Sequence, residues 1–284
     1  MRGGLAPISG SSVGAMKIAI YPTDLTDAQW KLVEPMLPLP KLRGRPRTDL
    51  RRVSNALLYV AKAGCPWSML PRDFPPGKTI YHIFRRWTRD HFGEALNARL
   101  RALVRGGEGK QSRPTAAILD SQSVKSDPHG GVVGYDATKR IKGRKRHLLV
   151  DTLGLVLGVK VTSADTPERE GAQALLGQVL VWLSWLRLIW VDGGYTGDAF
   201  SQWVKRLRPN LEIQVVKRSD TARGFKVLAH RWVVERTFGW LMRHRRLVRD
   251  YETTVESAEA FIFIALIRIQ IRSCLLYTSP SPRD

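Results

Sequence analysis

Three acidic residues have the types and positions that could hold divalent cations. Asp120 ends the apolar run 116–119, Asp192 ends the apolar run 188–191, and Glu235 lies in a strongly helical stretch, 230–246. Two carboxylates at the tips of buried strands and one on a helix can converge on hard cations, which prefer oxygen ligands. Two such cations about 3.5–4 Å apart stabilise the attacking and leaving oxygens of a displacement at phosphorus. The pattern therefore predicts metal-dependent phosphoryl transfer.

Each of the three acids also has a plain structural interpretation. Asp120 could belong to a turn, where aspartate is common. Asp192 is followed by Gly193 and Gly194, and glycines let a backbone turn sharply or approach a phosphate closely. Glu235 could form a surface ion pair with Arg231, four residues earlier, which would contribute only a few tenths of a kcal/mol. Chemistry is therefore predicted from the three residues together and from none of them alone.

The other acids of this half of the chain lack the placement at the end of an apolar strand. Asp151 lies in an expected hairpin turn, Asp198 is expected to cap a helix, and Asp165, Glu168 and Glu170 open another helix. Acidic residues at the start of a helix interact favourably with its dipole. We therefore expect structural roles for these five residues.

We expect a helix over 228–246, with Glu235 at the edge of its buried face. At about 100° per residue, Val234, Phe238 and Leu241 form the apolar stripe. The residues expected beside Glu235 are Arg231, Gly239, Met242 and Arg246. This position would let the carboxylate face a cleft, with cations nearby for a phosphate.

The composition indicates a polyanionic partner. The chain has 284 residues, 46 Lys+Arg against 25 Asp+Glu, a formal net charge of +21 and a pI of about 10.6. Such an excess favours nucleic acid, because neutralised phosphates release counterions, although ribosomal and anionic-membrane binders share it. Hydrophobic residues make up 43%, which argues against global disorder.

The chain has two cysteines, Cys65 and Cys274. Two are too few for a disulfide framework or a cysteine zinc cluster, and they are consistent with a reducing cytosol.

Both ends of the sequence are expected to lie outside the fold. Residues 1–22 form a Gly/Ser-rich tail without the apolar core of a signal peptide, and the true start could be Met1 or Met16. Residues 274–284 depart from the preceding helical pattern and look like a translated sequencing adapter. On this interpretation the natural chain is cut near Ser273.

Residues 23–104 are expected to form a helical, DNA-binding domain. Thr26 and Gln29 form a capping box before a short helix, and further helices are expected over 49–63 and 79–104. Arg85, Arg86 and Arg89 project around the last one. Short helices with arginine-rich faces suit a helix-turn-helix DNA reader. A helical scaffold with a solvated basic surface is the alternative.

A Gly-rich linker, 105–114, separates this part from an α/β domain, 115–273. Strands are expected over 115–121, 146–150, 155–162, 188–192 and 212–217. Helices are expected over 169–186, 198–207 and 228–246. The second and third strands flank the turn 151–154 and should form a hairpin. The order predicts a mixed sheet flanked by helices.

Basic residues around the acids are candidates for contacts with DNA. The run 139–147 leads into the second expected strand, where it could grip DNA or form a solvated loop. The candidate DNA-binding residues are Lys125, Lys142, Arg144, Lys145, Arg146, Arg231, Arg236, Arg243 and Arg246. Trp232 or Trp240 could stack on an unpaired base if exposed, although a helical tryptophan is more often packed.

Several ordered motifs resemble the DDE transposases of small bacterial insertion sequences. They are AILDSQSVK (117–125), KGRKRH (142–147), VDGGY (191–195) and RWVVERTFGW (231–240), with LTDAQW (25–30) and GCPWSMLP (64–71) upstream. The resemblance covers about 21–273. It implies an RNase H-like catalytic core in which Asp120 touches two divalent ions while Asp192 and Glu235 each hold one. Related elements carry Tyr-x2-Arg-x3-Glu-x6-Lys around the glutamate. Here Leu228 replaces the tyrosine and Met242 the lysine, which leaves Arg243 or Arg246 to contact the phosphate.

These observations lead to the hypothesis of a DNA transposase. It would bind the terminal inverted repeats of its element, and use two Mg²⁺ ions, with Mn²⁺ tolerated, to cut DNA and join the freed 3′-OH to a target. Its partners would be double-stranded DNA and further copies of itself, as a homodimer or higher multimer, in the cytoplasm at the bacterial nucleoid. The alternatives are an RNase H-like nuclease or resolvase that does not join strands, and a catalytically inactive DNA-binding protein.

Overall fold

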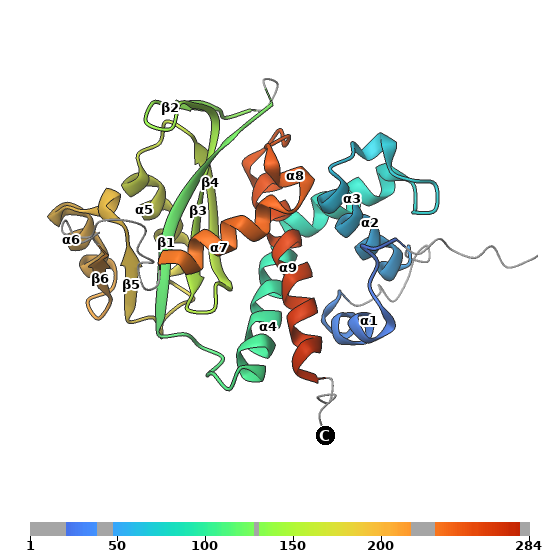
Figure 1. Cartoon of the computed structure of the whole chain (residues 1–284), viewed down its shortest axis with the longest axis horizontal. Helices are drawn as coiled ribbons and strands as arrows, with labels where there is room; N and C mark the ends of the chain where they lie inside the picture. Colours follow the sequence, from blue (N-terminus) through green and yellow to red (C-terminus); the bar gives the residue numbers. More distant parts are fainter. Residues whose placement is uncertain (1–20, 39–47, 128–130, 217–230, 279–284) are drawn as a thin grey trace, which may run out of the picture.

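The computed structural model describes residues 21–38, 48–127, 131–216 and 231–278. A helical body lies beside a sheet that has helices on both faces (Figure 1). The helices of the first half are α1 (Asp27–Val33), α2 (Leu50–Ala63), α3 (Gly77–Arg89) and α4 (Phe92–Gly107), with short 3-10 turns at Glu34–Met36 and Trp67–Met69. The later helices are α5 (Glu168–Val179), α6 (Asp198–Leu207), α7 (Arg231–Met242), α8 (Arg245–Val248) and α9 (Val255–Thr278), with a 3-10 turn at Gly193–Tyr195.

The sheet is mixed, as predicted. Its strands are β1 (Ala116–Lys125), β2 (Gly134–Asp136), β3 (Ile141–Asp151), β4 (Val156–Ser163), β5 (Leu188–Val191) and β6 (Glu212–Val215). Their order is β2-β3-β1-β5-β6, and β4 also pairs with β3. β1 is central, antiparallel to β3 and parallel to β5. The predicted hairpin is confirmed in β3 and β4.

Asp151, at the turn of this hairpin, has the expected structural role. Its carboxylate accepts hydrogen bonds from the backbone N–H groups of Leu153 and Leu155 at 2.9 Å.

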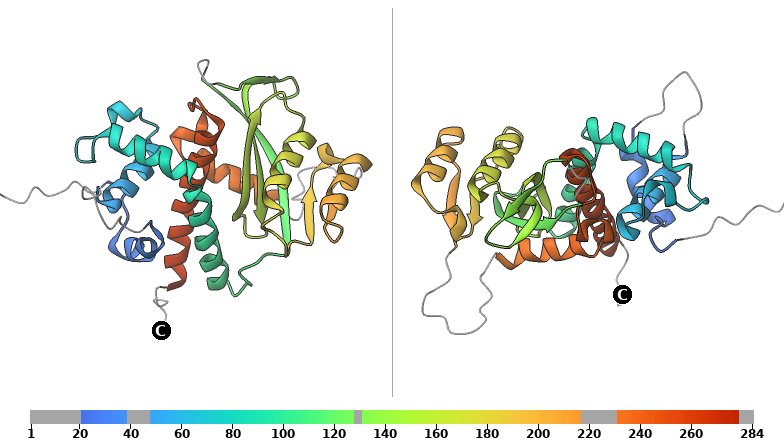
Figure 2. Two further views of the ribbon diagram at one scale, coloured as in Figure 1. Left: turned by 180° about the vertical axis from the view of Figure 1, so that it is seen from behind. Right: turned by 90° about the horizontal axis from the view of Figure 1, so that it is seen from above.

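Two apolar cores lie on opposite faces of the sheet. Ala117 and Leu119 of β1 pack in one core with α5 and α6, whereas Ile118 packs in the other with α7 and the helical body. The alternation follows from the period of two in a strand. Figure 2, seen from above, shows α5 and α7 on opposite sides of the strands.

The first helices begin where the sequence predicts, but one expected helix is two. The capping box of Thr26 and Gln29 is confirmed at α1, and Asp49 caps α2 through the N–H groups of Arg51 and Arg52. The single helix expected over 79–104 is wrong. α3 ends at Arg89 and α4 begins at Phe92, because His91 has the left-handed φ of 51°, which an α-helix does not accommodate.

α9 joins the helical body to the sheet. It packs along α4 and also against β4, α1 and α2. The expectation that the chain departs from the helical pattern at 274 is wrong for residues 274–278, because α9 continues to Thr278 with Cys274 buried in the core. The division of the chain at 105–114 and the origin of residues 274–284 stay predictions. Residues 1–20 and 279–284 of the two expected terminal segments lie outside the described part.

No helix of the described ranges combines the length and the apolarity that crossing a membrane requires.

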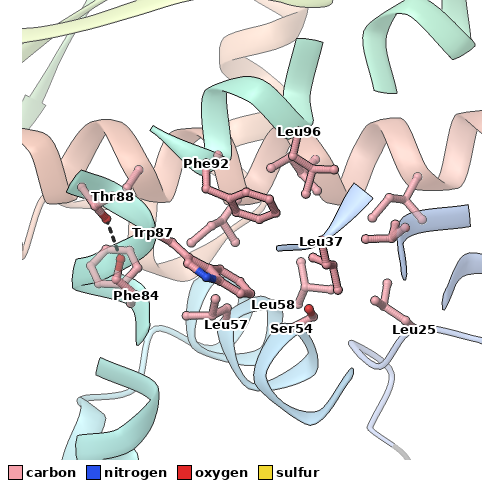
Figure 3. Close-up of a pocket in the computed structure, with 16 residues that line it drawn as sticks. Leu25, Leu37, Ser54, Leu57, Leu58, Phe84, Trp87, Thr88, Phe92 and Leu96 are labelled. Carbon is pink, nitrogen blue, oxygen red and sulfur yellow. Dashed lines mark hydrogen bonds between the residues drawn. The ribbon is translucent and has the colours of Figure 1, made fainter. Parts of the chain in front are cut away.

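The interior of the helical body contains a small apolar cavity of about 70 Å³. Leu57, Phe84, Trp87, Phe92 and Leu96 are among the side chains that line it (Figure 3). The Thr88 hydroxyl beside it donates to the carbonyl of Phe84 at 2.9 Å. These helices therefore share one packed interior, to which α9 contributes Ala260, Ile264, Ile267 and Ile271.

Candidate active site

Asp120 and Asp192 lie side by side at the centre of the sheet. The last paired residues of the parallel strands β1 and β5 are Ile118 and Trp190. Asp120 lies two residues further along β1, and Asp192 lies directly after the end of β5 with an extended backbone, φ −86° and ψ −178°. Because side chains alternate along a strand, the aspartates belong to the same face as Ile118 and Trp190. Both of those residues contact the core beneath α7.

The carboxylates of these two aspartates also fix their own backbone. Asp120 Oδ1 accepts from the N–H of Ser121 at 2.7 Å. Asp192 Oδ1 accepts from the N–H of Gly194 at 2.9 Å and caps the 3-10 turn Gly193–Tyr195. Both side chains are partly exposed. Asp192 therefore follows the end of β5, as predicted, whereas the predicted strand end at Asp120 is wrong, because β1 continues paired with β3 as far as Lys125.

Glu235 is carried by α7, which packs across β1. Val234, Phe238 and Leu241 are buried, so the predicted apolar stripe is confirmed, and Glu235 at its edge is exposed. The β3–β4 turn holds this helix, because the Thr237 hydroxyl donates to the Gly154 carbonyl at 2.9 Å. The arrangement fixes the helix against the strand that carries Asp120.

The surroundings of Glu235 differ from the prediction in one respect. The helix expected over 228–246 ends at Met242, and Arg246 lies in α8. The Arg246 guanidinium is buried, donates to Glu252 Oε1 at 2.7 Å and to the Cys65 carbonyl at 3.0 Å, and packs on Phe261. Its expected place beside Glu235 is therefore wrong. The side chain of Arg231, and all of residues 217–230, lie outside the described part.

Four predicted DNA-binding residues are in the interior. β3 begins at Ile141, five residues before the expected strand, so the basic run is mostly strand. Arg144 bonds to Asp250 and to the carbonyls of Val132, Glu252 and Thr253. Arg146 donates to the Leu247 carbonyl at 2.7 Å, and burial lowers its pKa to about 10. Lys145 donates to the Thr166 carbonyl at 2.8 Å. These three residues hold β3 to its neighbours, whereas the fourth, Arg246, joins α8 to Glu252 and to the helical body. The charge of all four is buried.

Of the other predicted basic contacts, those whose side chains the structure describes are at least partly accessible. Lys125, Lys142 and Arg243 are exposed. Arg236 is half-buried between Trp232 and Trp240, with its guanidinium carbon 4.4 Å and 4.7 Å from the ring centroids. It also donates to the Leu153 carbonyl at 2.8 Å. Trp232 is exposed, with the Arg236 guanidinium over its ring, whereas Trp240 is half-buried.

The structure adds Glu168 to the acidic site. Its Oε1 accepts from the Ser121 hydroxyl at 3.1 Å, next to Asp120 in β1. Sequence reasoning assigned this residue to the start of a helix, and that placement is correct. What it missed is the position of α5, whose first turn brings Glu168 to Ser121 within β1 and to Gly194, just after β5. No spacing in the sequence carries this information, because it depends on how α5 packs against the sheet.

The donors at this site are carboxylate oxygens, which suit hard divalent cations. Burial and the charges of Asp120, Glu168 and Asp192 raise the pKa of the Tyr195 hydroxyl well above its usual range. The three carboxylates are therefore close enough to this buried hydroxyl for their charges to act on it. Within the described ranges, no three His, Cys, Asp or Glu side chains are grouped closely enough to hold a metal ion. The side chains fit a cation in chemistry, and Glu235 joins them only as part of the proposal below.

The sheet order, with helices on both faces and neighbouring aspartates within β1 and directly after β5, defines an RNase H-like α/β domain. Residues 111–269, more than half of the chain, match the family model described as "Transposase DDE domain". The chain belongs to this family. Residues 25–97 match the model "Putative transposase of IS4/5 family". The predicted resemblance and fold class are thereby confirmed.

Two proteins of Burkholderia cepacia are similar to this chain. The "Insertion element IS402 uncharacterized 16.2 kDa protein" is 30% identical over 117 residues, which are 39% of this chain and 78% of that protein. The "Putative transposase for insertion sequence element IS402" is 28% identical over 137 residues, which are 45% of this chain and 64% of that protein. The chain thus spans slightly less than two thirds of the second relative.

Proposed function

We propose that this transposase cuts DNA at the ends of an insertion sequence and joins the freed ends to target DNA. The observation that carries the proposal is the equal register of Asp120 and Asp192 on adjacent central strands. The packing of α7, with Glu235, across β1 supports it. Membership of the DDE family supports the same three residues as metal ligands.

The three acids would hold two Mg²⁺ ions, with Asp120 contacting both and Asp192 and Glu235 one each. When bound, such ions activate an oxygen nucleophile and stabilise the leaving oxygen at phosphorus. Water oxygen first forms a bond to phosphorus while the bond to a 3′ oxygen breaks, which frees a 3′-OH. That hydroxyl then bonds to a target phosphorus and displaces a target 3′ oxygen. The protein's own side chains would position the metal ions and the DNA, and none of them would form a covalent bond to the DNA. Mn²⁺ should replace Mg²⁺.

DNA binding is proposed for the accessible basic residues and for the helical body. Lys125, Lys142 and Arg243 are exposed around the sheet and α7, and Arg231 and Arg236 lie on the helix that carries Glu235. Arg85, Arg86 and Arg89 of α3 line an open cavity beside α9. The helical body would bind terminal inverted repeats, and a homodimer or higher multimer would hold two ends together. A net charge of +21 supports a polyanionic partner.

The substitution Asp120→Asn tests this proposal. It keeps the shape of the side chain and removes the charge, so we expect Mg²⁺-dependent cleavage of DNA that carries the element's ends to fall by at least about a thousandfold, a typical cost of removing electrostatic stabilisation of the transition state. Binding of the same DNA at matched salt should persist. The exposed Asp165 provides the control, since Asp165→Asn should cut like the wild type. Cleavage at the wild-type rate by Asp120→Asn would contradict the proposal.

A further inference from the structure

The turn between β3 and β4 is built around a buried ion pair. Asp151 is 0% exposed, and its Oδ1 accepts from the N–H groups of Leu153 and Leu155. Its Oδ2 accepts from Nη1 of Arg105 at 2.5 Å, and Arg105 is buried as well. Closing a hairpin needs no ion pair, and taking two charges out of water has a large desolvation cost. The pair therefore indicates a role beyond the turn itself.

Helix α4 binds both ends of this turn. Asn97, Arg101 and Arg105 follow one another at intervals of four residues in α4, which places them on one face of the helix. The Val156 carbonyl, at the start of β4, accepts from Arg101 Nη1 at 2.7 Å and from Asn97 Nδ2 at 3.0 Å. Arg105 binds Asp151, at the end of β3. The turn is therefore anchored to the helical body.

Helix α7 contacts the same turn through its backbone carbonyls. The Leu153 carbonyl accepts from Arg236 Nη2 at 2.8 Å, and the Gly154 carbonyl accepts from the Thr237 hydroxyl at 2.9 Å. Gly154 has a φ of 79°, and a Cβ there would lie 2.8 Å from the Thr237 hydroxyl oxygen. Arg236 and Thr237 directly follow Glu235 in α7. The turn therefore fixes the part of α7 that carries Glu235.

The charge of Asp151 acts on cations of both helices. Burial lowers the pKa of Arg101, in α4, to about 10 and lowers the pKa of Arg236, in α7, and the Asp151 carboxylate opposes both shifts. A neutral side chain at this position would leave these two cations, and Arg105, without the compensating charge. The aspartate thus acts electrostatically on α4 and α7 at once.

We propose that Asp151, anchored by Arg105, is a positioning residue for Glu235 and acts through the β3–β4 turn and Thr237. The inference rests on the proposed function, in which Glu235 is one of three acids at the reacting centre, and adds what holds this acid in place. A misplacement of about 1 Å at a reacting centre can slow a reaction about a hundredfold. Because α4 belongs to the helical body, the same contacts link that body to the helix of Glu235.

The substitution Thr237→Val tests the link to α7, because it removes the hydroxyl and keeps the branched shape. In single-turnover cleavage of DNA that carries the element's ends, the rate at saturating DNA should fall about 10- to 100-fold. The DNA concentration that gives half the maximal rate should stay unchanged, since DNA binding is not altered. Thr237→Ser keeps the hydroxyl and should recover most of the rate.

Thr88→Val is the matched control for this substitution. The Thr237 hydroxyl also donates to the carbonyl of Val233, four residues earlier, and the Thr88 hydroxyl makes the same bond to Phe84 in α3. Thr88 has no contact with the β3–β4 turn among the described hydrogen bonds. This variant should therefore cut like the wild type, which separates loss of the bond within a helix from loss of the bond to the turn.

The substitution Asp151→Asn tests the ion pair. It keeps an oxygen for the N–H groups of the turn and removes the charge that pairs with Arg105, so the rate at saturating DNA should fall as in Thr237→Val. Both changes act through one turn, so the double variant should be slowed less than the product of the two single effects. Hydrogen exchange of the backbone amides of α7, measured without DNA, should be faster in Asp151→Asn than in the wild type.

A wild-type rate at saturating DNA in Thr237→Val would overturn the inference even if its Tm falls, because a purely structural role changes stability alone. Multiplicative effects in the double variant would overturn it too. Should Asp151→Asn not fold, Thr237→Val and its serine counterpart decide. The two proposals fail differently. Unchanged exchange in α7 of Asp151→Asn refutes the positioning role alone, whereas a wild type that cuts no DNA with the element's ends refutes the proposed function.

Discussion

At the scale of single residues, charge alone does not tell a DNA contact from a structural residue. Arg144, Lys145 and Arg146 follow one another in a run that reads as a basic patch, yet all three are buried. Lys142, in the same run, is exposed. The difference arises because Arg144 and Arg146 meet the segment 247–253, and Lys145 meets the carbonyl of Thr166, on the faces of the sheet. The buried cations use backbone carbonyls as partners, which a sequence does not reveal.

His147 makes stability depend on pH. It is buried, packs under α5 and lies 3.1 Å from the Thr162 hydroxyl. Burial, together with the charges of Lys145 and Lys139, lowers its pKa from 6.5 to about 3. Between these values the unfolded chain binds a proton that the folded chain does not. Stability is therefore retained above pH 6.5 and is lost as the pH falls toward 3.

Replacing this side chain should flatten the pH dependence. The variant His147→Leu removes the group that titrates, so its free energy of unfolding should fall less between pH 6.5 and pH 4 than that of the wild type, by a few kcal/mol at most. Urea denaturation at a series of pH values measures the two curves. Burial also lowers the pKa of His244, to about 4, and this residue contributes the same pH dependence to the wild type and to the variant. If the free energy of unfolding fell equally with pH in both proteins, His147 would not be the group responsible.

At the scale of elements, local patterns predicted what depends on local contacts. The capping box of α1, the β3–β4 hairpin and the apolar stripe of α7 were predicted from neighbouring residues, and all three are confirmed. Asp120 and Asp192 were located because each directly follows an apolar run, although β1 continues beyond Asp120 to Lys125. The same reasoning failed where tertiary packing decides. The break at His91 and the end of α7 at Met242 carry no proline, and the approach of Glu168 depends on where α5 packs.

At the scale of the whole molecule, the basic charge should set how DNA binding responds to salt. The logarithm of the affinity falls linearly with the logarithm of salt concentration, with a slope that reflects the number of phosphates contacted. We expect Lys142→Ala to reduce this slope by about 1. Arg144→Met should instead lower stability, because it leaves Asp250 without its buried partner. Fluorescence anisotropy of a labelled duplex over a KCl series measures the slope, and an unchanged slope in Lys142→Ala would exclude a phosphate contact.

The central claim is that one acidic site on this fold both cuts and joins DNA. A strand-transfer assay with precut element ends, which already carry a free 3′-OH, isolates the joining step from cleavage. We predict Mg²⁺-dependent joining of these ends to target DNA by the wild type, and none by Asp120→Asn or Glu235→Gln, although both variants should still bind the ends. Joining by either variant at the wild-type rate would contradict the account, and cleavage of uncut ends without any joining by the wild type would identify a nuclease instead.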